Sequence, residues 1–326
     1  MNHNPQAYQA CLQQSVYYPL ADAGLLRLQG RDRLTFVQRQ TTNNINLLTP
    51  QKGQISVLTS ATARILDVFF AFSPAGQAEE SLVMLPSKAA ETARYLKNRI
   101  FFMDQVSLFN EGELYQQYLL EGPQAGDVLR QLGCQAPEGS DSIQTGMIDN
   151  QPITLLGWRG LTAGNLAYRL LTPAAAGQAI EHALQTAGAV LLDEFSREIL
   201  RVEAGQPALG SELSEEFNPL EVGLSYAVSD NKGCYTGQEI IARQITYDKV
   251  TRQMVGLRLA QPVRQGSEVL CEDKSAGKVT SSVESPRFGP LALAVLKRPY
   301  FAPETKVVVV SDDQQISAMV AALPFV

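Results

Sequence analysis

The pattern of the sequence changes near residue 250, and this change constrains the fold more than any other feature. Beyond it, short apolar runs such as KVVVVSD and QISAMVAAL alternate with turns rich in Gly, Pro and Asp, and helical periodicity is absent. Such a pattern is typical of a small all-β barrel or sandwich. We therefore predict a C-terminal all-β domain, either a barrel or a sandwich, over residues 249–326.

The first 200 residues are organised differently. Apolar alternation predicts strands at GLLRLQG, ISVLTS and ARILDVFFAF, while amphipathic periodicity predicts helices over 87–101 and 174–189, with Ser87 as the N-cap of the first. The order strand–helix–strand–strand–helix–strand recurs, which indicates two α+β units whose antiparallel sheets carry helices on one face. We expect these two lobes to be intertwined within residues 1–248, with the middle lobe at about 51–136.

Composition excludes several classes of function. The formal net charge of −6 disfavours generic binding to nucleic acids or to anionic membranes. The chain has no apolar run of membrane-spanning length and no signal-peptide pattern at its start, so we expect a cytoplasmic protein without a membrane partner. Four widely spaced cysteines and two histidines disfavour a disulfide framework, a metal site and a Ser-His-Asp triad.

The segment NKGCYTGQE, residues 231–239, combines several reactive and conformationally special residues. Gly233 and Gly237 allow positive φ, and the neighbouring ammonium of Lys232 would favour the thiolate form of Cys234. The segment therefore predicts either a reactive or ligand-capturing cysteine or a buried structural cysteine in a turn. QEIIARQ continues as a helix that begins near Gln238, with Arg243 about one turn further on.

Glu203 ends a helix predicted from about Asp193 to Ala204, in the segment RVEAGQP. The carbonyl end of a helix disfavours a carboxylate, so a glutamate there either meets a specific donor or is simply exposed. A third segment, GRDRLTFVQRQTTNN, presents arginines and amides to a ligand or forms a cationic helix face.

These segments together resemble a known family. The run K-G-C-Y-T-G-Q-E resembles the signature of the YgfZ proteins, which are folate-binding relatives of the glycine cleavage T-protein, an aminomethyltransferase. RVEAGQPALGSELSEEFNPLEVGL and GRDRLTFVQRQTTNNINLL are similar to two further segments of the T-protein, with Asn44 replacing an aspartate. GKVTSSVESPRFGPLALAVLKRPY is similar to part of its C-terminal barrel, so the resemblance extends from about residue 24 to the end.

The resemblance implies a three-lobed α+β architecture in which two related folate-binding lobes and a C-terminal β-barrel surround a central channel. It implies tetrahydrofolate, or a one-carbon derivative, as cofactor, held against Glu203. It further implies that Lys232 and Cys234 act in catalysis, and it places a second set of residues around the folate. That set comprises Gly233, Tyr235, Gly237, Gln238 and Arg243.

One departure concerns chemistry. T-proteins carry an essential aspartate in a stretch that corresponds to LVMLPSKAAETARYL, and Ser87, Lys88 and Ala89 stand there instead. Because that acid is missing, we expect folate binding with altered chemistry. The resemblance to the YgfZ proteins implies the leading hypothesis, which is support for the assembly or repair of iron-sulfur enzymes, including those that modify tRNA, with these enzymes or their assembly factors as partners. The alternatives are a folate-dependent one-carbon transferase and an interaction scaffold without chemistry.

Overall fold

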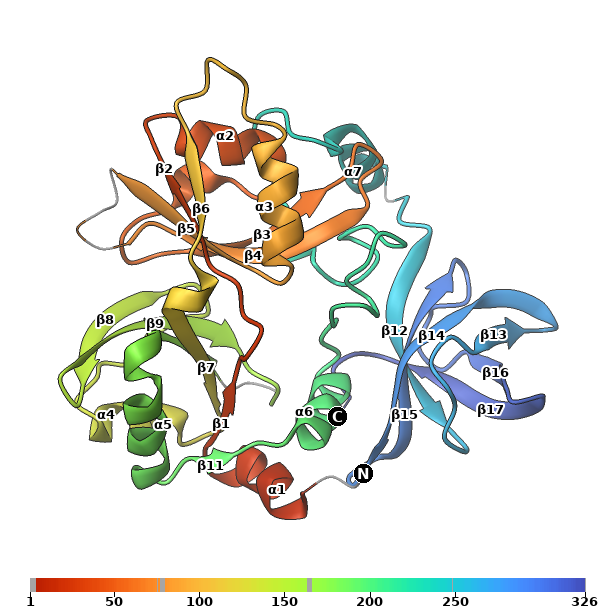
Figure 1. The fold of residues 1–326 in the computed structure, drawn as a ribbon. Coiled ribbons are helices and arrows are strands. Elements are labelled where there is room, and N and C mark those ends of the chain that lie inside the picture. Colours follow the sequence, from red (N-terminus) through yellow and green to blue (C-terminus); the bar gives the residue numbers. More distant parts are fainter. Residues whose placement is uncertain (1–3, 75, 77–79, 163–165, 248, 326) are drawn as a thin grey trace.

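A computed structural model describes residues 4–74, 76, 80–162, 166–247 and 249–325, which form two α+β lobes and a barrel arranged around a central region (Figure 1). The expected fold class is confirmed. The two sheets face one another and form most of the walls of the site described below, whereas the barrel lies to one side.

The first lobe is a five-stranded antiparallel sheet in the order β3-β4-β5-β2-β6. One face packs on two helices through Leu28, Phe36, Phe69 and Leu96, all nearly inaccessible to solvent. The strands are β2 (Leu26–Gln29), β3 (Gln54–Thr59), β4 (Ile65–Phe72), β5 (Ser81–Pro86) and β6 (Ser107–Asn110), and the helices are α2 (Arg33–Gln40) and α3 (Ala89–Lys97).

The second lobe is a six-stranded sheet in the order β11-β1-β7-β10-β9-β8. Leu120, Leu170 and Ile180 belong to the core between this sheet and its helices. The strands are β1 (Val16–Pro19), β7 (Tyr115–Glu121), β8 (Ile143–Ile148), β9 (Gln151–Arg159), β10 (Leu166–Pro173) and β11 (Val190–Leu191), and the helices are α4 (Ala125–Gln131) and α5 (Gly177–Thr186).

The C-terminal domain is a closed barrel in the order β12-β15-β14-β13-β16-β17. Its interior is filled by small and branched side chains, including Val269, Val279, Ala292 and Val309. The strands are β12 (Arg252–Leu259), β13 (Glu268–Cys271), β14 (Lys274–Ser285), β15 (Gly289–Lys297), β16 (Lys306–Ser311) and β17 (Gln314–Ala321). Closure leaves the barrel without free edge strands.

The way in which the lobes intertwine differs from the expected boundaries. Strand β1 pairs with β7 and belongs to the second lobe, so the inserted sheet runs from Leu26 to Asn110 rather than from about 51 to 136. The expected N-cap at Ser87 is also wrong. Helix α3 begins at Ala89, and the buried carboxylate of Asp67 on β4 accepts hydrogen bonds from the Ser87 and Lys88 amides instead.

Three further helices connect the bodies: α1 (Pro5–Gln13), α6 (Glu194–Glu203) and α7 (Gln238–Thr246). Helix α6 packs on α1 and on barrel strands β14 and β15. Asp193 caps α6, because its side chain accepts a hydrogen bond from the Ser196 amide. In the part of the chain that the structure describes, no helix has both the length and the hydropathy needed to cross a membrane.

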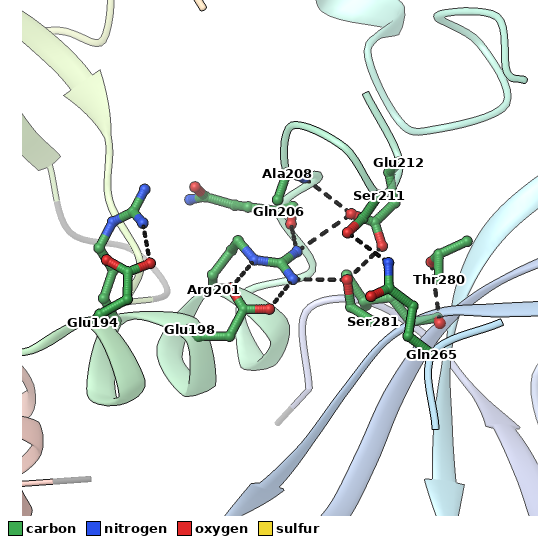
Figure 2. A network of polar contacts seen from close by, with 12 residues as sticks. Glu194, Glu198, Arg201, Gln206, Ala208, Ser211, Glu212, Gln265, Thr280 and Ser281 are labelled. Atoms are coloured by element: carbon green, nitrogen blue, oxygen red, sulfur yellow. Dashed lines mark hydrogen bonds and ion pairs between the residues drawn. The ribbon is translucent and has the colours of Figure 1, made fainter. Parts of the chain in front are cut away.

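Arg201 on α6 organises a buried group of polar contacts, which we call the Arg201 network (Figure 2). Its guanidinium donates to Ser281 Oγ on β14 at 2.7 Å, to the Gln206 carbonyl oxygen at 2.6 Å and to Glu198 Oε2 at 2.7 Å. Glu212, fully buried, lies 3.4 Å from the guanidinium and also accepts from Ser281. A helix, the loop after it and the barrel are therefore joined through one cation.

We predict that Arg201→Met lowers the free energy of unfolding by roughly 3–5 kcal/mol, because it leaves the Glu212 carboxylate buried without its cation. The matched control is Arg130→Met, which removes an exposed ion pair with Asp127 and is expected to cost less than about 1 kcal/mol. Urea denaturation of the three proteins measures both values. An equal loss of stability in the two variants would contradict the role assigned to Arg201.

Candidate functional site

A cavity of about 580 Å³ lies between the two sheets and the segment that follows α6, and we call it the central cavity. Its walls come from the connection between β1 and β2, the end of β5, strands β7, β9 and β10, helix α6 and residues 206–213. A smaller recess of about 170 Å³ continues it between the sheets and shares Trp158, Arg159 and Arg169 with it. Both lobes, helix α6 and the segment after α6 thus contribute to one site.

Strand register determines which side chains face the central cavity. Arg169 on β10 is directly opposite Leu119 on β7, and Ala167 is opposite Trp158 on β9. Residues opposite one another in an antiparallel pair share a face, as do residues two apart along a strand. Leu119, Glu121, Trp158 and Arg169 therefore lie on one face, and all four line the cavity.

Arg169 is a buried cation without a carboxylate partner among the described residues. Its side chain donates from Nε to Gln117 Oε1 at 2.7 Å, and its guanidinium carbon lies 5.1 Å from the Trp158 ring centroid. Burial lowers the pKa of Arg169 to about 10, which leaves it charged at neutral pH. A desolvated guanidinium with unused donors on a cavity wall is suited to bind an anionic or carbonyl oxygen.

Glu121 is the buried acid of the same wall. It is 3% exposed, and its Oε2 accepts a hydrogen bond from the Leu161 amide at 2.9 Å. Burial raises the pKa of Glu121 to about 7, against the opposing effects of that hydrogen bond and of Arg197. A carboxyl with such a pKa exchanges its proton near neutrality.

Aromatic rings supply flat surfaces beside these charges. The Trp158 ring centroid lies 5.6 Å from that of Phe70, which projects from the sheet of the other lobe. The guanidinium carbon of Arg159 lies 3.7 Å from the ring centroid of Tyr226. These four residues line the recess of about 170 Å³, so the site offers aromatic and cationic groups to a planar ligand.

Glu203 does not line the central cavity. Its carboxylate accepts hydrogen bonds from Tyr8 at 2.7 Å and from Ser285 at 2.6 Å, and it forms an ion pair with Arg287. We call these four residues the Glu203 network. It joins α1, α6 and the barrel, and it answers why an acid is tolerated at this helix end: specific donors surround it.

The segment 231–237, which we call the Cys234 loop, packs on the first lobe outside the central cavity. Cys234 is exposed. Lys232 is buried, and its ammonium donates to the carbonyl oxygens of Gln38, Thr41 and Asn43 at 2.8, 2.5 and 2.7 Å. Its three hydrogens are thus used at the end of α2, and it makes no contact with the thiol. Burial lowers the pKa of Lys232, and the three acceptors oppose that effect by favouring the charged form.

The remaining predicted residues form the support of this loop. Gly237 has φ of +85°, and a Cβ there would lie 2.7 Å from the Ser60 carbonyl oxygen, so glycine is required. Gly233 has open space around it and no positive φ. Tyr235 is buried against Ala63 and Ile241, Gln238 begins α7, and Arg243 is exposed on that helix. None of the predicted site residues lines the central cavity.

Sequence reasoning missed Glu121, Trp158 and Arg169. Each interrupts an apolar strand with a polar or aromatic side chain, at LYQQYLLEG, GWRG and AYRLL. That signal existed, but a solvent-facing strand position gives the same pattern. Among the residues that the structure describes, no group of three or more His, Cys, Asp or Glu could hold a metal ion.

Comparison with protein families matches nearly the whole chain. Residues 6–232 match the GCVT N-terminal domain, and residues 252–326 match the glycine cleavage T-protein C-terminal barrel domain. The two matches together include the residues that line the central cavity, whereas Cys234 lies in the segment 233–251 between them.

Individual relatives agree with this match. The chain is 32% identical over 313 residues to a protein of Arabidopsis thaliana described as a proposed chloroplastic transferase, covering 95% of this chain and 71% of that protein. It is 28% identical over 291 residues to the aminomethyltransferase of Exiguobacterium sibiricum, covering 88% and 80%. The crystal structure of aminomethyltransferase T of the glycine cleavage system from Bartonella henselae shares the fold, with a TM-score of 0.85, 21% identity and coverage of 98% and 89%.

We predict that Lys232→Met destabilises the protein by roughly 3 kcal/mol, because three buried or partly buried carbonyl oxygens lose a charged donor. Alkylation of Cys234 should become faster as its loop loosens. Lys274→Met, at an exposed position on the barrel, is the control and should change neither property. Unchanged stability and unchanged alkylation in Lys232→Met would show that these contacts do not hold the loop.

Proposed function

The chain belongs to the glycine cleavage T-protein family of folate-dependent, aminomethyltransferase-like proteins, and from that premise we propose that it binds tetrahydrofolate or a one-carbon derivative in the central cavity. Bound tetrahydrofolate would supply the nitrogen atoms that carry the one-carbon unit. The residues of this chain would bind and orient it and exclude water around it.

The observation that carries this proposal is the composition of the cavity wall. Trp158 offers an aromatic surface to a planar heterocycle and is backed by the buried ring of Phe70, and Arg169 offers unused donors to a carbonyl or carboxylate oxygen. Glu121 offers a carboxyl group to the N–H donors of a pterin. A flat ring with both donors and acceptors on its edges, and with an anionic tail, matches this set of groups.

Glu203, which we expected to contact the pterin, would instead act indirectly, through the position of helix α6. The Glu203 network fixes the C-terminal end of α6 against α1 and the barrel. The same helix contributes Glu194, Arg197, Glu198 and Arg201 to the cavity wall. We therefore assign Glu203 a positioning role for that wall.

The second part of the proposal concerns the Cys234 loop. We propose that the exposed thiol serves the assembly or repair of iron-sulfur enzymes, including tRNA-modifying ones, as in the YgfZ proteins. Support comes from the intact K-G-C-Y-T-G-Q-E run and from the way Lys232 and Gly237 hold the loop so that Cys234 is exposed. One thiol gives at most one of the ligands that a stable cluster takes, so any cluster contact would be shared with the partner.

A folate-dependent one-carbon transferase is the second candidate, because several curated relatives are aminomethyltransferases. The position of the T-protein aspartate holds Ala89 here, at the start of α3. The nearby carboxylate of Asp67 is occupied by Ser87, Lys88 and Thr92. The acid–base group that this transfer needs is therefore missing from its usual place.

Calorimetric titration with tetrahydrofolate tests the binding proposal. We predict that the wild type binds and that Arg169→Gln weakens binding about tenfold or more, because a charge-assisted hydrogen bond contributes roughly 1.5–3 kcal/mol. Arg264→Gln, which removes an exposed ion pair on the barrel, is the control and should bind as the wild type does. Absence of binding by the wild type would contradict the proposal.

Complementation of a strain lacking this protein tests the iron-sulfur proposal, with the activity of iron-sulfur enzymes as the readout. We predict that Cys234→Ser fails to restore activity although it folds and binds tetrahydrofolate normally. Cys271→Ser, at a half-buried thiol on the barrel, is the matched control and should complement. Full complementation by Cys234→Ser would favour a scaffold in which the loop is only structural.

A further inference from the structure

Glu121 is a buried ionisable group for which no role follows from the family match. We propose that Glu121 exchanges a proton when ligand enters the central cavity: it is a carboxyl in the ligand-free protein and a carboxylate that accepts N–H donors of the reduced pterin in the complex. This inference rests on the proposed folate binding and assigns to that site a specific acid–base residue.

The geometry leaves one oxygen of Glu121 for a ligand. The residue ends β7, two positions after Leu119, on the face that carries Arg169. Its Oε2 accepts the Leu161 amide, whereas its Oε1 accepts no hydrogen bond from any described residue. Glu121 lines the central cavity although only 3% of its surface is exposed. A nearly buried carboxyl group with one unused oxygen at a cavity wall is suited to meet a donor there.

The charged and titratable groups around Glu121 have other partners, although Arg197 Nε and part of the Arg169 guanidinium make no hydrogen bond with any described residue. On α6, Arg201 pairs with Glu198, and Arg197 pairs with Glu194 and lies over the Tyr18 ring of β1. On β10, Arg169 bonds Gln117. On α1, the Cys11 thiol is buried, and burial raises its pKa, so it stays neutral. No cation among the described residues forms an ion pair with Glu121, and the attraction of Arg197 offsets the effect of burial on its pKa only in part.

Burial without a cationic partner explains why Glu121 is protonated in the ligand-free protein. It raises the pKa of Glu121 to about 7, so the ligand-free protein holds the proton over much of the range below neutrality. N–H donors from a bound pterin stabilise the carboxylate and lower the pKa in the complex. Binding then releases a proton to the solvent, and the affinity rises with pH below neutrality and levels off above it.

The size of the effect follows from this linkage. With a pKa of about 7 in the ligand-free protein, the affinity for tetrahydrofolate should rise about tenfold between pH 6 and pH 8. At pH 6.5, between roughly half a proton and one proton should be released for each ligand bound.

The experiment is anaerobic titration calorimetry of the full-length protein with tetrahydrofolate, at pH 6.5, in buffers that differ in ionisation enthalpy. The dependence of the observed heat on the buffer gives the number of protons released. Glu121→Gln keeps the size of the side chain and an acceptor for the Leu161 amide but has no proton to lose. It should bind with little proton release and with little change in affinity from pH 6 to 8. Glu113→Gln, at an exposed position, is the matched control and should behave as the wild type.

The outcomes separate this inference from the proposed function. Binding by the wild type without proton release would overturn the role of Glu121 and leave folate binding intact, and this result needs no variant. Proton release that persists in Glu121→Gln would also overturn it. Absence of any binding by the wild type would remove both the proposed function and the inference.

Discussion

The buried guanidinium of Arg201 is the interaction on which the arrangement of the site depends. A cation removed from water is tolerated only where acceptors surround it, and here they come from α6, from the loop after α6 and, through Ser281, from the barrel. The Glu203 network holds helix α1 against α6 as well. Two charged side chains on α6 therefore hold the barrel against the lobes, and α6 itself forms part of the cavity wall.

The two candidate functional elements are physically distinct. The central cavity presents Arg169 and Glu121, which are buried, ionisable and incompletely bonded, and such groups are suited to binding a polar ligand away from water. The Cys234 loop presents an exposed thiol whose neighbour Lys232 is fully engaged with backbone carbonyls. The structure thus separates a partly enclosed cavity from an exposed thiol.

Much of the fold could be predicted from the sequence, because periodicity and turn residues report on local structure. The barrel and helix α6 follow from such patterns. The pairing of β1 with β7 could not be predicted in this way, because contacts between residues about a hundred positions apart leave no local signal in the sequence. For the same reason Lys232, adjacent to Cys234 in sequence, was expected to act on the thiol, although its ammonium is directed to the end of α2. Glu121 and Arg169 could not be separated from solvent-facing strand residues without knowing what covers their face.

The central claim is that the cavity between the two lobes, α6 and the loop after α6 binds a reduced folate. A crystal structure of the protein with bound tetrahydrofolate tests it most directly. The account predicts the pterin beside Trp158, with an N–H group within hydrogen-bonding distance of Glu121 Oε1 and an oxygen of the ligand near Arg169. A folate bound elsewhere on the protein, or a pterin held by Glu203 with Glu121 and Arg169 uninvolved, would contradict it.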